Sequence, residues 1–132
     1  NIRLADIKFT DIQCRINTFD KDVTAELETT LTYLVALKEK DENKFFVIFQ
    51  VSLADKRKSF KFKAKATAHF ETNERLTSDF VNSPFARINA PAIAFPYIRV
   101  FISNFTLSGY HPVMLPAFNF VEMAKETRSL PI

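Results

Sequence analysis

The sequence predicts an α+β fold: a four-stranded antiparallel meander sheet, followed by a long helix, a crossover loop and a shorter C-terminal helix. Residues 2–72 alternate between apolar and polar side chains, in runs typical of strands. Residues 90–108 carry apolar residues at helical spacing, and a capping pattern for a second helix begins at Asn119. We expect one domain of 132 residues, with a connection at 73–89 and the helices and crossover loop at 90–128.

Three runs show the strand alternation most clearly. Residues 23–37 are apolar at all but one odd position, residues 44–54 at the odd positions, and residues 60–70 at the even positions. Each run therefore has one face suited to a core and one suited to solvent. Residues 44–54 add Phe46 and Ile48 on the other face, which predicts a central strand.

The first run alternates with slips in phase. Its apolar residues fall into three sets, namely Ile2 and Leu4, then Ile7 and Phe9, then Ile12, Cys14 and Ile16. A slip would turn the next set to the opposite face of the sheet unless the strand absorbs an extra residue. The sequence therefore predicts one or two bulges or bends in this strand.

The apolar faces of neighbouring strands agree only in certain registers. The second and third strands must pair with an even sum of residue numbers, for example Leu37 with Phe45. The third and fourth must pair with an odd sum, for example Leu53 with Phe60. The opposite face then collects an apolar island of Leu34, Ala36, Phe46 and Ile48. Either the island binds extended peptide or another subunit, or the connection at 73–89 folds over it.

The predicted helix at 90–108 is too apolar for one sheet to cover. From Tyr97 to Ser108 the apolar positions span an arc of roughly 220°, which leaves Arg99, Ser103 and Thr106 as a polar strip. We expect one side of the helix to pack on its own sheet and the other on a partner subunit. The residues expected at this oligomer interface are Tyr97, Ile98, Phe101, Ile102 and Phe105.

Composition argues against several classes of function. A single glycine excludes a glycine-rich phosphate loop, and the isolated His69, His111 and Cys14 do not have the spacing of metal ligands. We therefore expect no enzyme, no cofactor and no metal. The lone cysteine excludes an internal disulfide, and no segment has the pattern of a membrane span or signal peptide. The expected location is the cytoplasm, without membrane insertion.

Charged residues define a candidate partner-binding face on the polar side of the sheet. It comprises Lys61, Lys63 and Lys65 on the last strand, together with Glu26 and Glu28. The net charge of +3 is mildly basic. Nucleic acid is the weaker interpretation, because lysines on a strand more commonly keep that strand solvated and free of aggregation.

Residues 91–120 read PAIAFPYIRVFISNFTLSGYHPVMLPAFNF and resemble the SecB family of protein-export chaperones. The matching elements, in order, are Phe95, Pro96, Tyr97 and Arg99 in the long helix, Gly109 at its end, Pro112 and Leu115 in the crossover loop, and Asn119 and Phe120 at the last helix. Each element alone is common, and the ordered set is specific. The preceding four-strand pattern also agrees with the SecB fold.

The resemblance implies a homotetramer, built as a dimer of dimers, that binds unfolded or extended polypeptide clients in hydrophobic grooves. It implies no cofactor and a function in protein export. The crossover loop would line the groove with Tyr110, Val113, Met114, Leu115 and Phe118, and the strand pattern adds Phe46. The alternative role of these side chains is to close the core under the loop.

Some features depart from the family pattern. SecB proteins are typically acidic and offer carboxylates to the translocase motor SecA, whereas this chain has lysines on the corresponding face. Ile98 replaces the alanine of the FPYAR motif, and Ser108 replaces the arginine before the helix-ending glycine. Engagement of SecA therefore stays open. The alternative function is a SecB-fold partner protein dedicated to one target, for example an antitoxin.

Overall fold

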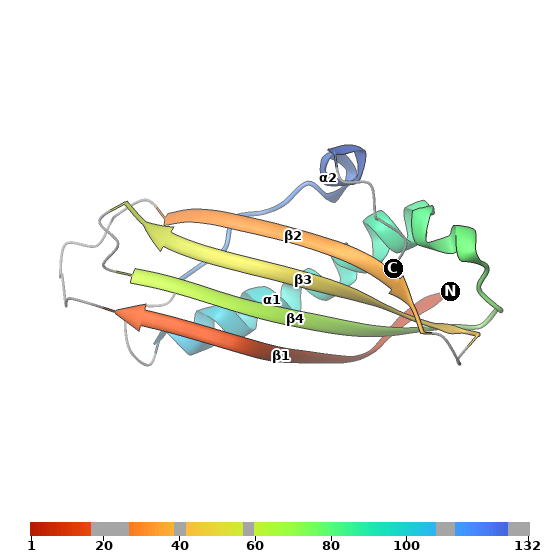
Figure 1. The fold of residues 1–132 in the computed structure, drawn as a ribbon, viewed down its shortest axis with the longest axis horizontal. Helices are drawn as coiled ribbons and strands as arrows, with labels where there is room; N and C mark the ends of the chain where they lie inside the picture. The colour runs from red at the N-terminus through yellow and green to blue at the C-terminus, as the bar shows by residue number, and fades with distance from the viewer. Residues whose placement is uncertain (17–26, 39–41, 57–59, 108–112, 127–132) are drawn as a thin grey trace.

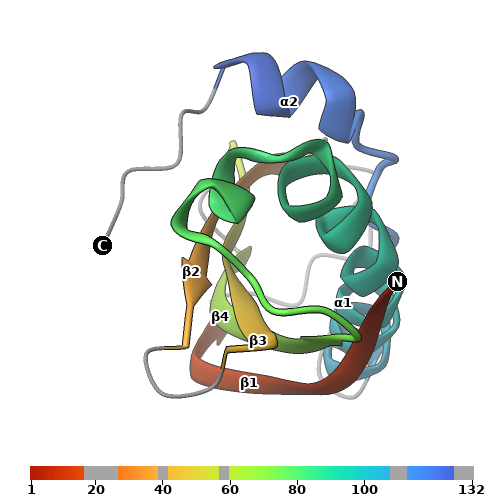
Figure 2. The same ribbon diagram turned by 90° about the vertical axis from the view of Figure 1, so that its right-hand side faces the viewer.

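The computed structural model describes residues 1–16, 27–38, 42–56, 60–107 and 113–126. Its elements are β1 (Ile2–Ile16), β2 (Leu27–Leu37), β3 (Lys44–Asp55), β4 (Phe60–Thr72), the 3-10 helix η1 (Ser78–Asn82), the π-helix η2 (Phe85–Asn89), α1 (Ala90–Leu107) and α2 (Phe120–Glu126). The helix α1 crosses one face of the sheet, and α2 lies beyond its β2 edge (Figures 1 and 2). This is the predicted α+β architecture.

The order of the strands is β1-β4-β3-β2, and all neighbours are antiparallel. Strands β2, β3 and β4 follow one another as the predicted meander requires. The prediction was wrong for β1, which pairs with β4 rather than with β2. The alternation of a strand determines its buried face but not its neighbour. The connection at 17–26 is longer than the ~2–5 residues of a typical hairpin loop, so the chain is free to reach the other edge.

Two β-bulges in β1 confirm the predicted slips. The register shifts between Leu4 and Asp6 and again between Thr10 and Gln13, and Asp11 in the second bulge has a positive φ of 53°. Each bulge gives β1 one residue that β4 does not match, so the apolar residues after it return to the same face. Ile12 is the exception, because it lies within the second bulge and is 38% exposed. The face that β1 shares with the buried side of β4 thereby receives Ile2, Leu4, Ile7, Phe9, Cys14 and Ile16.

The registers agree with the predicted faces. Leu37 pairs with Phe45, as expected. The β3–β4 register has the expected parity, but Leu53 pairs with Phe62 rather than with Phe60. A shift by two residues leaves every side chain on its face, so burial alone could not distinguish the two registers. The hairpin end is closed instead by the buried Asp55, whose Oδ1 accepts a 3.2 Å hydrogen bond from the main-chain N–H of Phe60.

The core lies between the inner face of the sheet, defined here as the face toward α1, and the helical segments. Its largest fully buried side chains are Phe45, Phe49, Phe60, Phe62 and Phe70 from the strands, with Ile98 and Ile102 from α1. Burying one such side chain contributes about 1.5–3 kcal/mol. The ring of Phe9 stacks on Phe101 of α1 with a centroid distance of 3.9 Å.

The connection at 73–89 packs on the inner face of the sheet. The ring of Phe80 contacts the inner-face residue Phe45 at a centroid distance of 4.8 Å, and Leu76, Val81 and Ile88 also pack on the core. The alternative in which this connection covers the apolar island on the opposite face is therefore wrong. The connection itself contains two short helices, η1 and η2.

The predicted cap of the last helix is confirmed. Asn119 Oδ1 accepts hydrogen bonds from the main-chain N–H groups of Val121 (3.1 Å) and Glu122 (3.2 Å). These bonds satisfy donors that have no partner inside the helix. The cap fixes the point at which the crossover segment ends and α2 begins.

Thr106 fastens the crossover segment to α1. Its side chain is buried, and Oγ1 donates to the carbonyl oxygen of Ile102 (2.8 Å) and accepts from the N–H of Val113 (2.9 Å). Thr106→Val keeps the shape but leaves that buried N–H without a partner. We expect the free energy of unfolding to fall by about 1–3 kcal/mol in urea denaturation. Thr106→Ser, which keeps the hydroxyl, is the control, and equal stability of Thr106→Val and wild type would contradict the assignment.

Candidate functional site

The helix α1 presents an apolar surface, which we call the outer stripe, on the side away from the sheet. It consists of Ile93, Tyr97, Val100 and Leu107, whose side chains are between 39% and 59% exposed. Phe101 and Phe105 border the stripe; Phe105 is 37% exposed and contacts Phe62 of β4 at 5.5 Å between ring centroids. The wide apolar arc is thus divided between the protomer's own core and its surface. Apolar patches of this kind mark interaction sites.

Two of the expected interface residues lie elsewhere. Ile98 and Ile102 are 0% and 1% exposed and belong to the core of the protomer, so their assignment to an oligomer interface is corrected. The small residues Ala90 and Ala94 precede them at intervals of four and are also fully buried. Side chains four residues apart share one helix face, so these four form the face that approaches the sheet.

Two of the three residues of the polar strip of α1, Ser103 and Thr106, contact the crossover segment. Ser103 Oγ donates to Met114 Sδ at 3.7 Å, whereas the guanidinium of Arg99 lies 5.2 Å from the ring centroid of Phe95 on the same helix. Thr106 binds the start of the same segment, as described above. With one side on the sheet and another under the crossover segment, α1 retains only the outer stripe for further contacts.

The crossover segment, residues 113–119, has the side-chain alternation of an extended strand. Val113 and Leu115 are each 4% exposed and point into the core, whereas Met114 between them is 70% exposed. In the described part of the chain, the main-chain groups of residues 114–117 make no hydrogen bond to the rest of the protein. Unpaired N–H and C=O groups on an extended segment can pair with another extended chain.

An aromatic cluster underlies the crossover segment and α2. The ring of Phe95 lies 5.2 Å from that of Phe118 and 5.7 Å from that of Phe120, and Phe120 lies 5.9 Å from Tyr33 of β2. The Tyr33 hydroxyl donates to the carbonyl oxygen of Arg87 (2.7 Å), which ties β2 to η2. Burial raises the pKa of Tyr33, and the charge of Arg87 partly offsets this effect.

The cluster reaches the surface at its crossover end. Phe118 is only half-buried, and Val121, in the first turn of α2, is 47% exposed. Together with Met114 these side chains form what we call the crossover surface. Its apolar side chains stand beside the unpaired main chain of residues 114–117, and this combination suits extended polypeptide.

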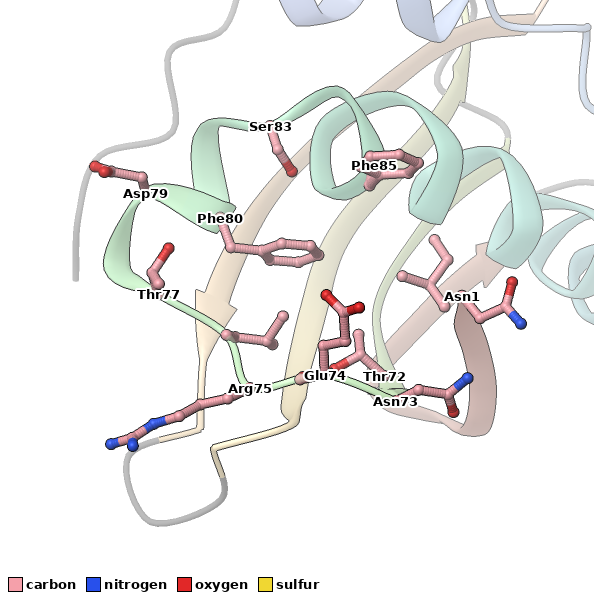
Figure 3. A pocket seen from close by; sticks show the side chains of 12 residues that line it. Asn1, Thr72, Asn73, Glu74, Arg75, Thr77, Asp79, Phe80, Ser83 and Phe85 are labelled. Carbon is pink, nitrogen blue, oxygen red and sulfur yellow. Dashed lines mark hydrogen bonds between the residues drawn. The ribbon is translucent and has the colours of Figure 1, made fainter.

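A hollow of about 490 Å³ opens at one end of the sheet, between the start of β1, the connection after β4 and the η1–η2 segment (Figure 3). Ile2, Leu76, Phe80 and Phe85 supply its apolar lining, and Phe85 is 59% exposed. Polar side chains such as those of Thr72, Glu74 and Asp79 lie around them. Sequence reasoning missed this hollow, because Leu76, Phe80 and Phe85 are spaced through the connection at 73–89 without a sustained pattern.

The structure separates the predicted groove residues. Met114 and Phe118 reach the surface, whereas Val113 and Leu115 close the core beneath the crossover segment, because alternate residues of an extended segment point in opposite directions. Phe46 lies on the outer face of the sheet, which is the face away from α1, and so does not join them. Tyr110 lies outside the described residues.

The predicted partner-binding residues that the structure describes share the outer face of the sheet. Lys61, Lys63 and Glu28 are exposed and Lys65 is half-buried, while Glu26 lies outside the described residues. The register also assembles the predicted apolar island on this face. Leu34 pairs with Ile48 and Ala36 with Phe46, and all four side chains are half-buried.

The described residues offer little for metal or membrane chemistry. Within them, no three His, Cys, Asp or Glu side chains are grouped so that they could hold a metal ion. None of the helices in the same ranges has the length and hydropathy needed to cross a membrane. The Cys14 side chain is exposed, but the surrounding protein removes enough water from the thiol to raise its pKa.

Comparisons with known proteins agree with this architecture. An uncharacterised protein of Methanocaldococcus jannaschii, MJ0357, is 30% identical over 109 residues, which cover 79% of this chain and 69% of that protein. The Mycobacterium tuberculosis SecB-like chaperone Rv1957, solved with a peptide of the HigA1 antitoxin, has a TM-score of 0.69 and 17% identity over 89% of this chain and 90% of its own. A protein of unknown function from Streptococcus agalactiae gives a TM-score of 0.54 and 12% identity over 89% and 98%.

These two solved structures show a shared fold. The family is identified by a sequence model, that of the preprotein translocase subunit SecB, which matches residues 6–129. This range includes most of β1, the other three strands and both α-helices. The chain belongs to the SecB family.

Proposed function

We propose that this protein is a chaperone that holds unfolded or extended polypeptide on its crossover surface. The observation that carries the proposal is the unpaired main chain of residues 114–117 beside the exposed Met114 and the half-buried Phe118. Main-chain hydrogen bonds pair with any client sequence, and apolar side chains add affinity for aromatic and aliphatic residues. Binding of this kind uses no nucleotide, cofactor or catalytic step.

The hollow beside η1 and η2 supplies a second apolar contact. Its volume of about 490 Å³ lies in the range of small-ligand pockets, about 300–1,000 Å³, and can admit a bulky client side chain. The antitoxin peptide bound to Rv1957 supports a polypeptide ligand for a protein of this fold.

We place the activity in the cytoplasm, where a lone cysteine such as Cys14 stays reduced.

The outer stripe supports a homo-oligomer. Tyr97, Val100 and Leu107 are each more than half exposed, and a second copy of the chain would remove them from water. We propose that protomers associate through this stripe and its neighbours Phe101 and Phe105. A dimer of dimers is the arrangement implied by the family. It would leave the crossover surface available for clients.

A role in protein export is supported by the description of the family as a preprotein translocase subunit. The outer face of the sheet is basic here, whereas SecB proteins typically offer acidic residues to SecA. We therefore separate client holding, which the crossover surface supports, from engagement of the motor. The first can be tested with purified protein alone.

The test is suppression of aggregation. A model client unfolded in guanidinium is diluted into buffer with increasing amounts of this protein, and light scattering is recorded. We expect scattering to fall to near the level of buffer once chaperone protomers are equimolar with client. Bovine serum albumin at equal mass is the control. Unchanged scattering at several-fold molar excess of this protein would overturn the proposal.

A dedicated partner protein is the second candidate, and the Rv1957 complex with an antitoxin peptide favours it. Affinity measurements distinguish the candidates. A general chaperone is expected to bind several unrelated unfolded proteins within about tenfold of one another in Kd, a spread of about 1.4 kcal/mol. A single stoichiometric partner in a pull-down, with far weaker binding of all model clients, would favour the dedicated role instead.

A further inference from the structure

The outer face of the sheet carries a row of four cationic side chains. Arg15 of β1 pairs in register with Lys61 of β4, and Lys63 and Lys65 follow at alternate positions on the same face. Within the described ranges none of these four side chains forms an ion pair. Alternate residues of a strand lie ~6.8 Å apart, so the cations repel one another and an anionic ligand would relieve the repulsion.

No described carboxylate forms an ion pair with the row. Asp6 Oδ2 lies 3.9 Å from Lys8 Nζ, and the Glu71 carboxylate forms ion pairs with Arg3 and Lys44. Glu28 is separated from Lys61 by the intervening β3 strand, a distance of ~10 Å, which exceeds the Debye length of ~8 Å at physiological salt. The net field over the row is therefore positive.

The apolar island continues the same face beyond the row. Gln50 lies beside Lys65, and next along β3 are Ile48, beside Thr67, and Phe46, beside His69. The ring of Phe46 lies 5.9 Å from that of His69. The described helices pack on the opposite face or beyond the β2 edge, so none of them covers the island (Figures 1 and 2).

Cations followed by apolar residues favour a polypeptide over a nucleic acid. A phosphate backbone gains from the lysines but gains nothing from burying Phe46 and Ile48, whereas protein interfaces combine both kinds of contact. An extended peptide presents side chains ~6.8 Å apart on one side, which is the spacing of the lysines. Lys61 and His69 lie eight positions apart on β4, so an extended segment of about nine residues spans the row and the island.

We propose that the outer face of the sheet binds an acidic, extended segment of a partner protein. Its carboxylates contact Lys61, Lys63 and Lys65, and apolar residues further along it contact Phe46 and Ile48. This site is on the face of the sheet away from α1 and is separate from the crossover surface. It gives the chaperone a second, charge-selective contact that recruits a partner without competing with client.

Fluorescence anisotropy with a labelled nine-residue peptide tests the site. The peptide carries glutamate at three alternate positions, then leucine and phenylalanine at two further alternate positions, with serine and threonine between. Wild type is expected to bind it, and the triple variant Lys61→Glu/Lys63→Glu/Lys65→Glu to bind at least about tenfold more weakly. A peptide with lysine in place of glutamate should bind the triple variant and not the wild type.

Matched single variants localise the contact. Lys63→Glu is compared with Lys125→Glu, the same charge change on an exposed lysine of α2, and only Lys63→Glu is expected to weaken binding. Phe46→Ser is expected to weaken it about fivefold without altering the charge. Equal effects of Lys63→Glu and Lys125→Glu would show attraction by net charge alone and would overturn the proposal.

Two further outcomes decide between ligands. Absence of peptide binding at low salt would overturn the site. Tighter binding of an oligo-dT strand than of the peptide, unaffected by Phe46→Ser, would also overturn it, in favour of a nucleic-acid surface. Suppression of client aggregation should be retained by the triple variant, because the crossover surface is unchanged. Failure of the acidic site and failure of client holding are therefore seen in different assays.

Discussion

Val100→Asp is expected to leave the protomer folded and to release it as a monomer. Val100 is 58% exposed and lies near the middle of the outer stripe, so the protomer alone tolerates a charge there. In an interface formed by that stripe the carboxylate would be buried without a partner, which costs about 2–5 kcal/mol. A loss of that size weakens association by about 30-fold or more. The measurement is the molar mass by light scattering during size exclusion, at several protein concentrations.

Met114→Asp is the matched control for this experiment. It introduces the same charge at another exposed apolar residue, but Met114 lies on the crossover segment and not on the outer stripe. We expect Met114→Asp to keep the mass of the wild-type oligomer. A wild type that is monomeric at micromolar concentration, or a Val100→Asp variant that remains an oligomer, would show that the stripe is not the interface.

Alternation along the strands predicted much of the fold, because each strand buries the side chains of one face and leaves those of the other face nearer to solvent. It located the bulges of β1, since Ile7 and Phe9 could share a face with Leu4 only if the strand absorbed an extra residue. It could not choose the neighbour of β1, because β2 and β4 both offer an apolar face at a sheet edge. That choice depends on long-range packing and on the path of the connecting chain.

The candidate site was less predictable for a related reason. The apolar arc of α1 showed that a second contact surface exists, but not which residues face outward. The rotation of the helix is set by Ala90 and Ala94, whose small side chains let it approach the sheet and carry Ile98 into the core. In the crossover segment, Val113, Met114 and Leu115 are all apolar, so their side-chain types could not distinguish core from surface. The family resemblance treated all of these residues as groove.

Met114→Asp is expected to raise the concentration needed for half-suppression of client aggregation by at least about tenfold. The side chain is 70% exposed, so the substitution costs the folded protomer little, and urea denaturation should be close to that of wild type. A client that lays an apolar side chain on this position would instead have to desolvate a carboxylate. Leu115→Asp cannot test the site, because Leu115 is 4% exposed and a buried charge would unfold the protein.

Met114→Leu separates the chemistry of this position from its shape. Leucine keeps an apolar contact of similar volume, so we expect half-suppression at a concentration within about twofold of that of wild type.

Phe85→Asp introduces a negative charge, as Met114→Asp does, but in the lining of the hollow, where the ring is 59% exposed. Loss of client holding in Phe85→Asp and not in Met114→Asp would move the principal client contact from the crossover surface to the hollow. Loss in both, with the oligomer intact, would mean that one client chain spans the two sites, because an extended polypeptide binds through several weak contacts that act together.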